Sequence, residues 1–142
     1  MRVFDRDGNY LNYWFINNSQ AAVPGMAIDP IADRIYVLND NWMNFGGVYN
    51  TNGNFLALWG GITASAGGIC VDRAKGNICV SDMSLNRIYI LDSNGGLIAQ
   101  WGETGSGDGQ FNVARGICLN TALRRLYVVD RANQRVEYFN MH

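Results

Sequence analysis

Histidine, proline and cysteine are all scarce in this sequence. The single histidine is His142, the last of 142 residues, which excludes a histidine-rich zinc site within the chain. Three cysteines without a Cys-x-x-Cys pair fit buried free thiols in a reducing compartment better than a disulfide framework. We therefore expect all three cysteines to be free, which favours a cytoplasmic location. Seventeen glycines against two prolines indicate many tight turns.

A charge excess and long apolar runs are also lacking. Eleven basic and twelve acidic side chains give a net charge of −1, whereas a protein that binds phosphate groups usually shows a basic excess or stripe. Five arginines within residues 115–142 keep nucleic acid open as an alternative ligand. No apolar run approaches the roughly 18 residues that span a bilayer. Asp5, Arg6 and Asp7 stand where the apolar part of a signal peptide would lie, so neither a membrane segment nor a signal peptide is predicted.

The dominant feature of the sequence is an internal repeat. Three units align over residues 25–60, 68–102 and 116–139, and residues 2–14 match the latter half of the same unit. Gly25, Gly68 and Gly116 occupy the same position, 43 and 48 residues apart. Each unit contains four short apolar runs rich in β-branched and aromatic residues, as strands prefer. A period in the forties with four strands predicts the blade of a β-propeller.

The turns support this interpretation. Asp7-Gly8, Asn52-Gly53 and Asn94-Gly95 each lie between the third and fourth runs of a unit. An Asx-Gly pair supplies the positive φ angles of a type I′ hairpin, so we expect such a hairpin at all three places.

The chain resembles the NHL-repeat β-propeller family. The resemblance lies in the Trp-Gly-rich segment 101–112 followed by Arg115-Gly-Ile, and in the motifs Asp82…Asn86-Arg87 and Asp130…Asn133-Gln-Arg135. The first unit departs from the pattern, with Asn39 in place of Asp and Asn44-Phe45-Gly-Gly in place of Asn-Arg. The resemblance implies a binding scaffold for protein, peptide or RNA partners.

We therefore predict an all-β chain of about three propeller blades, each a four-stranded antiparallel sheet. The single segment 1–142 divides into a partial blade at 1–14, full blades at 21–60 and 66–102, and a blade at 114–140 that lacks its fourth strand. Six apolar positions should be almost fully buried: Ile28, Val37, Val71, Val80, Ile117 and Val128.

Several residues have both a structural and a functional interpretation. Trp14, Trp59 and Trp101 end the fourth strands and are expected to pack between blades. The pairs Asp82/Arg87 and Asp130/Arg135 either brace their own loops through charge-assisted hydrogen bonds or line a ligand face.

Two further features leave alternatives open. If Val71 pairs with Ile78, Cys70 faces Cys79, as packed thiols or as a reactive pair. The glycine-rich segment 102–109 lacks the Lys-Ser/Thr of a phosphate-binding loop, and its two acids are few for a calcium site.

The leading functional hypothesis is a non-enzymatic binding module without cofactor, metal or catalytic residues. By the resemblance, the contact candidates lie on the face that holds the loops between second and third strands and the connections from one unit to the next: Trp42, Phe45, Arg87, Arg115 and Arg135. Trp42 and Phe45 stand in the unit that lost the Asp and Arg, where they either bind a ligand or plug the gap.

An enzyme remains the second hypothesis, because some six-bladed propellers hydrolyse lactones or esters with a metal in the axial channel. Asp29, Asp72 and Asn120 end the first strand of each unit and would surround such an axis. Their repetition in every unit favours a role in capping turns. An RNA-binding module is the third hypothesis.

Three blades cannot close a ring, and an open arc would expose apolar faces and bare strand edges. We expect a homodimer in which two copies complete six blades about a two-fold axis, with strand 9–14 completing the other copy's last blade. Residues 2–4 and 135–139 both have the pattern of a third strand, one more than six blades require. Either one of them is displaced, or the sequence is an excerpt of a longer propeller.

Overall fold

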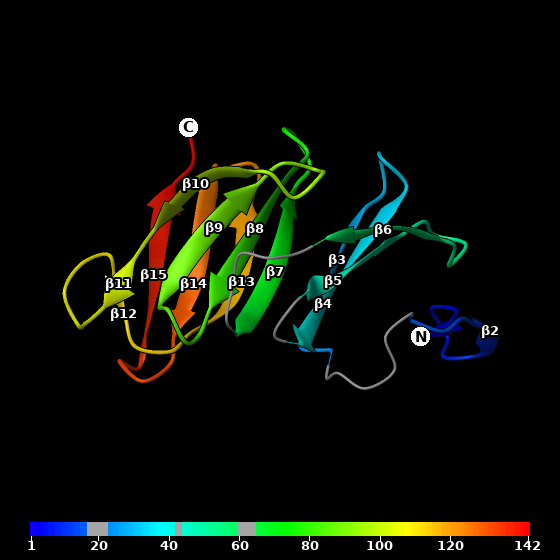
Figure 1. Cartoon of the computed structure of the whole chain (residues 1–142), viewed down its shortest axis with the longest axis horizontal. Coiled ribbons are helices and arrows are strands. Elements are labelled where there is room, and N and C mark those ends of the chain that lie inside the picture. The colour runs from blue at the N-terminus through cyan, green and yellow to red at the C-terminus, as the bar shows by residue number, and fades with distance from the viewer. Residues whose placement is uncertain (17–22, 42–43, 60–64) are drawn as a thin grey trace.

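A computed structural model describes residues 1–16, 23–41, 44–59 and 65–142, with the side chains of residues 40–45 left undescribed (Figure 1). Every regular element in these residues is a β-strand. No helix among them is long and apolar enough to cross a membrane. The prediction of an all-β chain is confirmed.

The strands form three consecutive sheets, here called blades 1 to 3. Each blade's strands pair antiparallel in sequence order, as predicted. Blade 1 contains β3 (Met26–Asp29), β4 (Arg34–Asn41), β5 (Asn44–Tyr49) and β6 (Phe55–Trp59). Blade 2 contains β7 (Ala66–Asp72), β8 (Asn77–Asp82), β9 (Arg87–Leu91) and β10 (Leu97–Trp101). Blade 3 contains β13 (Ala114–Asn120), β14 (Arg125–Asp130) and β15 (Arg135–Asn140).

Two small pairs complete the architecture. β1 (Arg2–Phe4) and β2 (Tyr10–Tyr13) form an antiparallel hairpin before blade 1, here called the N-terminal hairpin. β11 (Glu103–Thr104) and β12 (Gln110–Phe111) pair in parallel within the connection between blades 2 and 3.

The core lies between the blades, because side chains of a strand alternate between its two faces. Ile78 and Val80 of β8 face blade 1, whereas Cys79 between them faces blade 3. Both faces of the second and third strands of blade 2, β8 and β9, are therefore buried. Figure 1 shows the N-terminal hairpin beside blade 1, with blades 2 and 3, which overlap in this view, on the other side of blade 1.

A tryptophan at or just after the end of each fourth strand packs into the following blade, as predicted. Trp14 lies against Tyr49 of blade 1, with ring centroids 4.9 Å apart. Trp59 belongs to the core between blades 1 and 2, and Trp101 packs against the core between blades 2 and 3. A Cβ added to Gly95 would approach Trp59 to 2.7 Å, so this tryptophan lies directly beneath the next blade's turn.

The type I′ prediction for the Asx-Gly turns is wrong. Only the glycines have positive φ: 85° at Gly8, 85° at Gly53 and 89° at Gly95. The Gly8 N–H donates to the Asp5 carbonyl, so glycine is the fourth residue of the turn and not the third. This pattern, with the register shift that accompanies it, matches a type I turn followed by a bulge. The signal missed is the Asx three residues before the glycine.

The aspartate or asparagine three residues before the glycine stabilises the turn by accepting main-chain hydrogen bonds. Asp5 Oδ1 accepts hydrogen bonds from the N–H groups of Asp7 and Asn9, at 2.9 and 2.8 Å. Asn50 and Asp92 make the same pair of contacts in the equivalent turns of blades 1 and 2.

The burial prediction is confirmed for the second strands and wrong for the first strands. Val37, Val80 and Val128 are at most 1% exposed. Ile28 is 39% exposed, because Met1, Trp14 and Ile16, which cover this face of blade 1, pack against Ile35, Val37 and Tyr49 of its second and third strands. Val71 and Ile117 are half-buried, since they line a groove of about 480 Å³ along the first strands.

A charge placed between blades should unfold the protein. In Val80→Asp the carboxylate would lie unpaired in the core between blades 1 and 2, at a cost of several kcal/mol. We expect soluble expression and the cooperative thermal transition to be lost. Leu58→Asp, at a side chain 61% exposed, is the matched control and should fold. A folded Val80→Asp protein would contradict the blade packing.

The glycine turns offer a second test. Gly95→Ala and Gly8→Ala both place alanine at positive φ, which costs about 1–2 kcal/mol. The Gly95 methyl would also overlap Trp59, whereas Gly8 has open space around it. Urea unfolding should show Gly95→Ala to be the more destabilised of the two by at least about 1 kcal/mol. Equal losses would mean that Trp59 does not support the turn.

Candidate functional site

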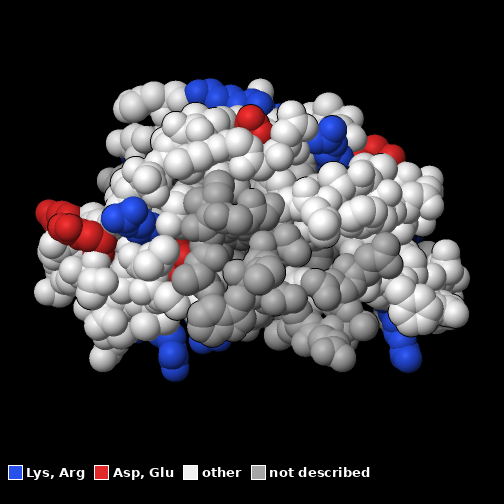
Figure 2. Space-filling model, in the orientation of Figure 1, with Lys and Arg blue, Asp and Glu red and all other residues white. Residues whose placement is uncertain are grey.

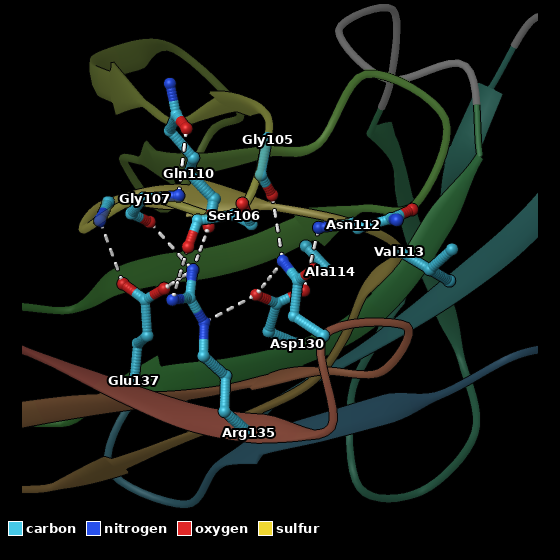
Figure 3. Close-up of polar contacts among 12 residues, drawn as sticks. Gly105, Ser106, Gly107, Gln110, Asn112, Val113, Ala114, Asp130, Arg135 and Glu137 are labelled. Atoms are coloured by element: carbon cyan, nitrogen blue, oxygen red, sulfur yellow. Dashed lines mark hydrogen bonds and ion pairs between the residues drawn. The ribbon is translucent and has the colours of Figure 1, made fainter.

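Arg135 is the centre of the largest polar network among the described residues, at the first position of β15 (Figure 3). Its Nε donates to Asp130 Oδ2 at 2.9 Å, and Asp130 is fully buried at the end of β14. Its two terminal nitrogens donate to three main-chain carbonyls at 2.8 Å each: Ser106, Gly107 and Gln110. It also forms an ion pair with Glu137.

The partners of Arg135 hold the same connection from other sides. Asp130 Oδ1 accepts from the Asn112 N–H at 2.7 Å, and Asn133 Nδ2 donates to the Gly105 carbonyl at 2.8 Å. Glu137 Oε2 accepts from the Gly109 N–H at 3.0 Å. Side-chain hydrogen bonds from blade 3 thus hold the glycine-rich segment between blades 2 and 3 in place.

Asn86 fastens the same connection to blade 2. Its Oδ1 accepts from the N–H groups of Val113 and Ala114, at 2.8 and 3.3 Å, and its Nδ2 donates to Thr104 Oγ1 at 3.0 Å. Sequence reasoning quoted Asn86 and Asn133 in the motifs but gave them no role. The asparagine three or four residues after a strand-ending aspartate was the available signal.

The brace interpretation of the Asp130/Arg135 pair is confirmed by these contacts. The second pair behaves differently. Asp82 Oδ1 caps its turn by accepting from the Ser84 and Leu85 N–H groups. Arg87 is exposed and donates to Gln100 Oε1 of the neighbouring strand at 3.5 Å. Arg135 is therefore held by several groups of the connection between blades 2 and 3, whereas the exposed Arg87 contacts Gln100 and Tyr89 of its own blade.

The remaining face candidates lie in different settings. Arg115 is exposed on β13, and its carbonyl accepts a hydrogen bond from the Ser81 hydroxyl of blade 2. Phe45 lies within strand β5 and not in a loop, and its side chain falls outside the described residues. Trp42 also lies outside them. On the face shown in Figure 2, the basic side chains of the described residues are separated by uncharged and acidic ones.

The three axial candidates all cap turns between first and second strands. Asp29 Oδ1 accepts from Ile31 and Ala32, Asp72 Oδ1 from Ala74, and Asn120 Oδ1 from Leu123. No group of three or more His, Cys, Asp or Glu side chains in the described part of the chain is arranged to hold a metal ion.

Asp72 also joins two blades. Arg124 of blade 3 donates to both of its carboxylate oxygens at 2.8 Å, a bidentate pair. The Arg124 hydrogen bonds hold the pKa of Asp72 below its ordinary value. The carboxylate therefore stays ionised as a structural tie.

The cysteines pair in register as predicted and remain free. Cys70 stands opposite Cys79 across β7 and β8. The hydrogen bond to Cys79, together with burial, raises the pKa of the Cys70 thiol. A raised pKa disfavours the thiolate, so the geometry describes packed thiols and not a reactive pair.

Among the described residues, the outer faces of the arc are exposed only in part, because Met1, Trp14 and Ile16 pack against Ile35, Val37 and Tyr49 of blade 1. On the leading face, Met26 and Ile28 of blade 1 are exposed. The trailing face of blade 3 exposes apolar side chains from all three strands: Cys118, Val129, Val136 and Tyr138. The equivalent surfaces between blades 1, 2 and 3 are buried cores.

No family model matches the chain. Among solved structures, it is similar to a chain of the crystal structure of a Nidogen/Laminin complex, with a TM-score of 0.68 and 21% sequence identity. The match covers 84% of this chain and 44% of that chain, so this chain spans less than half of that neighbour's length. The neighbour is a β-propeller.

The fold is therefore that of a β-propeller, of which the described residues form about three blades. At this level of identity the likeness concerns the fold. The expected NHL resemblance is supported as far as the propeller architecture.

The Arg135 network yields a stability prediction. Arg135→Gln would leave Asp130 buried without its cation and three carbonyls without their donor. We expect the free energy of unfolding to fall by about 2–4 kcal/mol. Arg87→Gln, at an exposed arginine, should change it by less than about 0.5 kcal/mol. Urea denaturation measures both, and equal effects would contradict a bracing role for Arg135.

Proposed function

We propose that this chain is a non-enzymatic, NHL-type propeller scaffold that binds protein, and that its first partner is a second copy of itself. The observations that carry the proposal are the exposed apolar face of blade 3 and the exposed first strand of blade 1. Surfaces of the same kind are buried wherever two blades meet within the chain. Exposed apolar patches of this kind mark protein interaction sites.

The two faces are complementary by repeat position. Met26 and Ile28 stand opposite Val37 and Ile35 in the register of blade 1, on the face that a preceding blade would cover. Val129 stands opposite Val136 on the face of blade 3 that a following blade would cover. Joining the trailing face of one copy to the leading face of another repeats the internal blade contact. Two copies would then supply a six-bladed ring.

A closed ring would present loops to further ligands. Arg87 and Arg115 are exposed near the connection between blades 2 and 3 and are our contact candidates for a protein or peptide. Trp42 and Phe45 remain candidates for the same face. The Nidogen/Laminin complex shows a related fold in an assembly of proteins, which supports this class of function. Arg135 contributes by holding the loop and not by direct contact.

The test is the mass of the full chain in solution. Light scattering at micromolar concentration should give twice the chain mass of 15.8 kDa. Val136→Asp, on the trailing face, should shift the protein toward monomer, because a charge would enter an apolar contact. Leu58→Asp, at a residue equally exposed at 61%, should leave the dimer intact. A wild-type protein that stays monomeric at this concentration would overturn the homodimer.

A further inference from the structure

The N-terminal hairpin and blade 3 each contain a strand of the same repeat position. In blade 2, the third-strand residues Tyr89 and Ile90 pair with Gln100 and Ala99, just before Trp101. In the hairpin, Arg2 and Val3 pair in the same way with Tyr13 and Asn12, just before Trp14. β1 is therefore a third strand and β2 a fourth strand. β15 of blade 3 is also a third strand, aligned with β9 through Arg135 and Arg87.

The two third strands differ in how firmly they are held. β15 pairs with β14 over all six of its residues, from Arg135 opposite Asp130 to Asn140 opposite Arg125. β1 has three residues, and among the described strands it pairs with β2 alone. A two-stranded hairpin is marginally stable by itself in water.

Among the described strands, β15 lacks a fourth strand beside it, and β2 is a fourth strand. The outer edge of β15 carries no partner strand among the described residues, and bare edges recruit strands. β2 already pairs with a third strand of this type. Its ring contact between Tyr10 and Phe4 has a direct counterpart, because Phe139 occupies the Phe4 position in β15.

We propose that β15 of one copy displaces β1 of the second copy and pairs with that copy's β2. This inference rests on the homodimer proposed above, and it names the strand that gives way. β2 becomes the fourth strand of the other copy's blade 3. By repeat position, Tyr138 stands opposite Asn12 and Phe139 opposite Tyr10 of the second copy.

The exchange removes β1 together with the Met1 contacts to Trp14 and leaves the three blades of each copy unchanged. Trp14 follows β2 directly and keeps its place against Tyr49 of its own blade 1. β2 is thus anchored to its own copy by the packing of Trp14, and it is joined to the other copy by main-chain hydrogen bonds with β15. A fourth strand that ends in a tryptophan packed into the next blade is the arrangement already present at Trp59.

Crosslinking in the full chain tests the register. Asn12→Cys and Tyr138→Cys are combined in a Cys118→Ser background, because Cys118 is exposed and would react. Under mild oxidation we expect a covalent dimer on a non-reducing gel. Adding reductant should convert this dimer to monomer. Either cysteine alone should give no such band. Absence of the band from the double variant in a protein that is dimeric would overturn the exchange.

A matched pair of proline substitutions tests which strand is displaced. Met1 and Trp14 exchange main-chain hydrogen bonds, so alternation makes Val3 and Asn12 the next hydrogen-bonded pair. Val3→Pro weakens the competitor β1 and should tighten the dimer several-fold. The second substitution, Asn140→Pro, lies in β15 at the position of Asp5, whose N–H donates to the Asn9 carbonyl in the hairpin. It removes a donor that only the exchanged pairing uses and should weaken the dimer by a similar factor. Sedimentation equilibrium measures both dissociation constants.

The outcomes separate the two proposals. If the wild type and both proline variants are monomeric at micromolar concentration, the homodimer itself is overturned. If all three dimerise with equal dissociation constants and the cysteine pair does not crosslink, the homodimer stands and the strand exchange is overturned. Opposite shifts for the two prolines, together with the crosslink, establish the exchange.

Discussion

Everything in this molecule depends on the packing of one sheet face against the next. A single strand such as β8 places Ile78 and Val80 in one core and Cys79 in another, so a blade has no hydrophobic core of its own. Burial is achieved only between neighbours. The tryptophans reinforce this arrangement, because each spans the junction from one blade into the next. The partly exposed faces at the two ends follow from the same constraint.

Polar groups have a different task, which is to fix the connections that carry the chain from blade to blade. The segment between blades 2 and 3 has few apolar side chains, and hydrogen bonds from Asn86 on one side and Arg135 on the other define its path. Asp130 is fully buried, and hydrogen bonds from three separate donors compensate for the loss of water around its carboxylate. The motif residues that resemble a family signature are thus mainly structural.

Much of the fold could be predicted from the sequence, because period-2 alternation and the Asx-Gly turns recur at one spacing. The tryptophan positions and the pairing of Cys70 with Cys79 followed from the same alignment. The turn type could not be read from Asx-Gly alone, since the aspartate or asparagine three residues earlier determines it. The exposure of Ile28 depends on what covers blade 1 from outside, which no local pattern records. Local sequence also does not record that the Arg135 donors bind main-chain carbonyls of the connection between blades 2 and 3, so Arg135 was predicted as a contact for a ligand.

The order of the strands has a consequence for how the molecule opens. Every blade pairs its strands in sequence order, so each sheet forms from contacts between chain neighbours. Each sheet is stable, however, only because its side chains pack against the adjoining sheets. Among the described residues, blade 2 has a neighbouring blade on each side, whereas blade 3 packs against blade 2 alone. We therefore expect the amide hydrogens of β8 and β9 to be better protected from exchange than those of β15. A lesion in the middle blade therefore removes a packing surface from two neighbours, whereas a lesion in the last blade removes it from one.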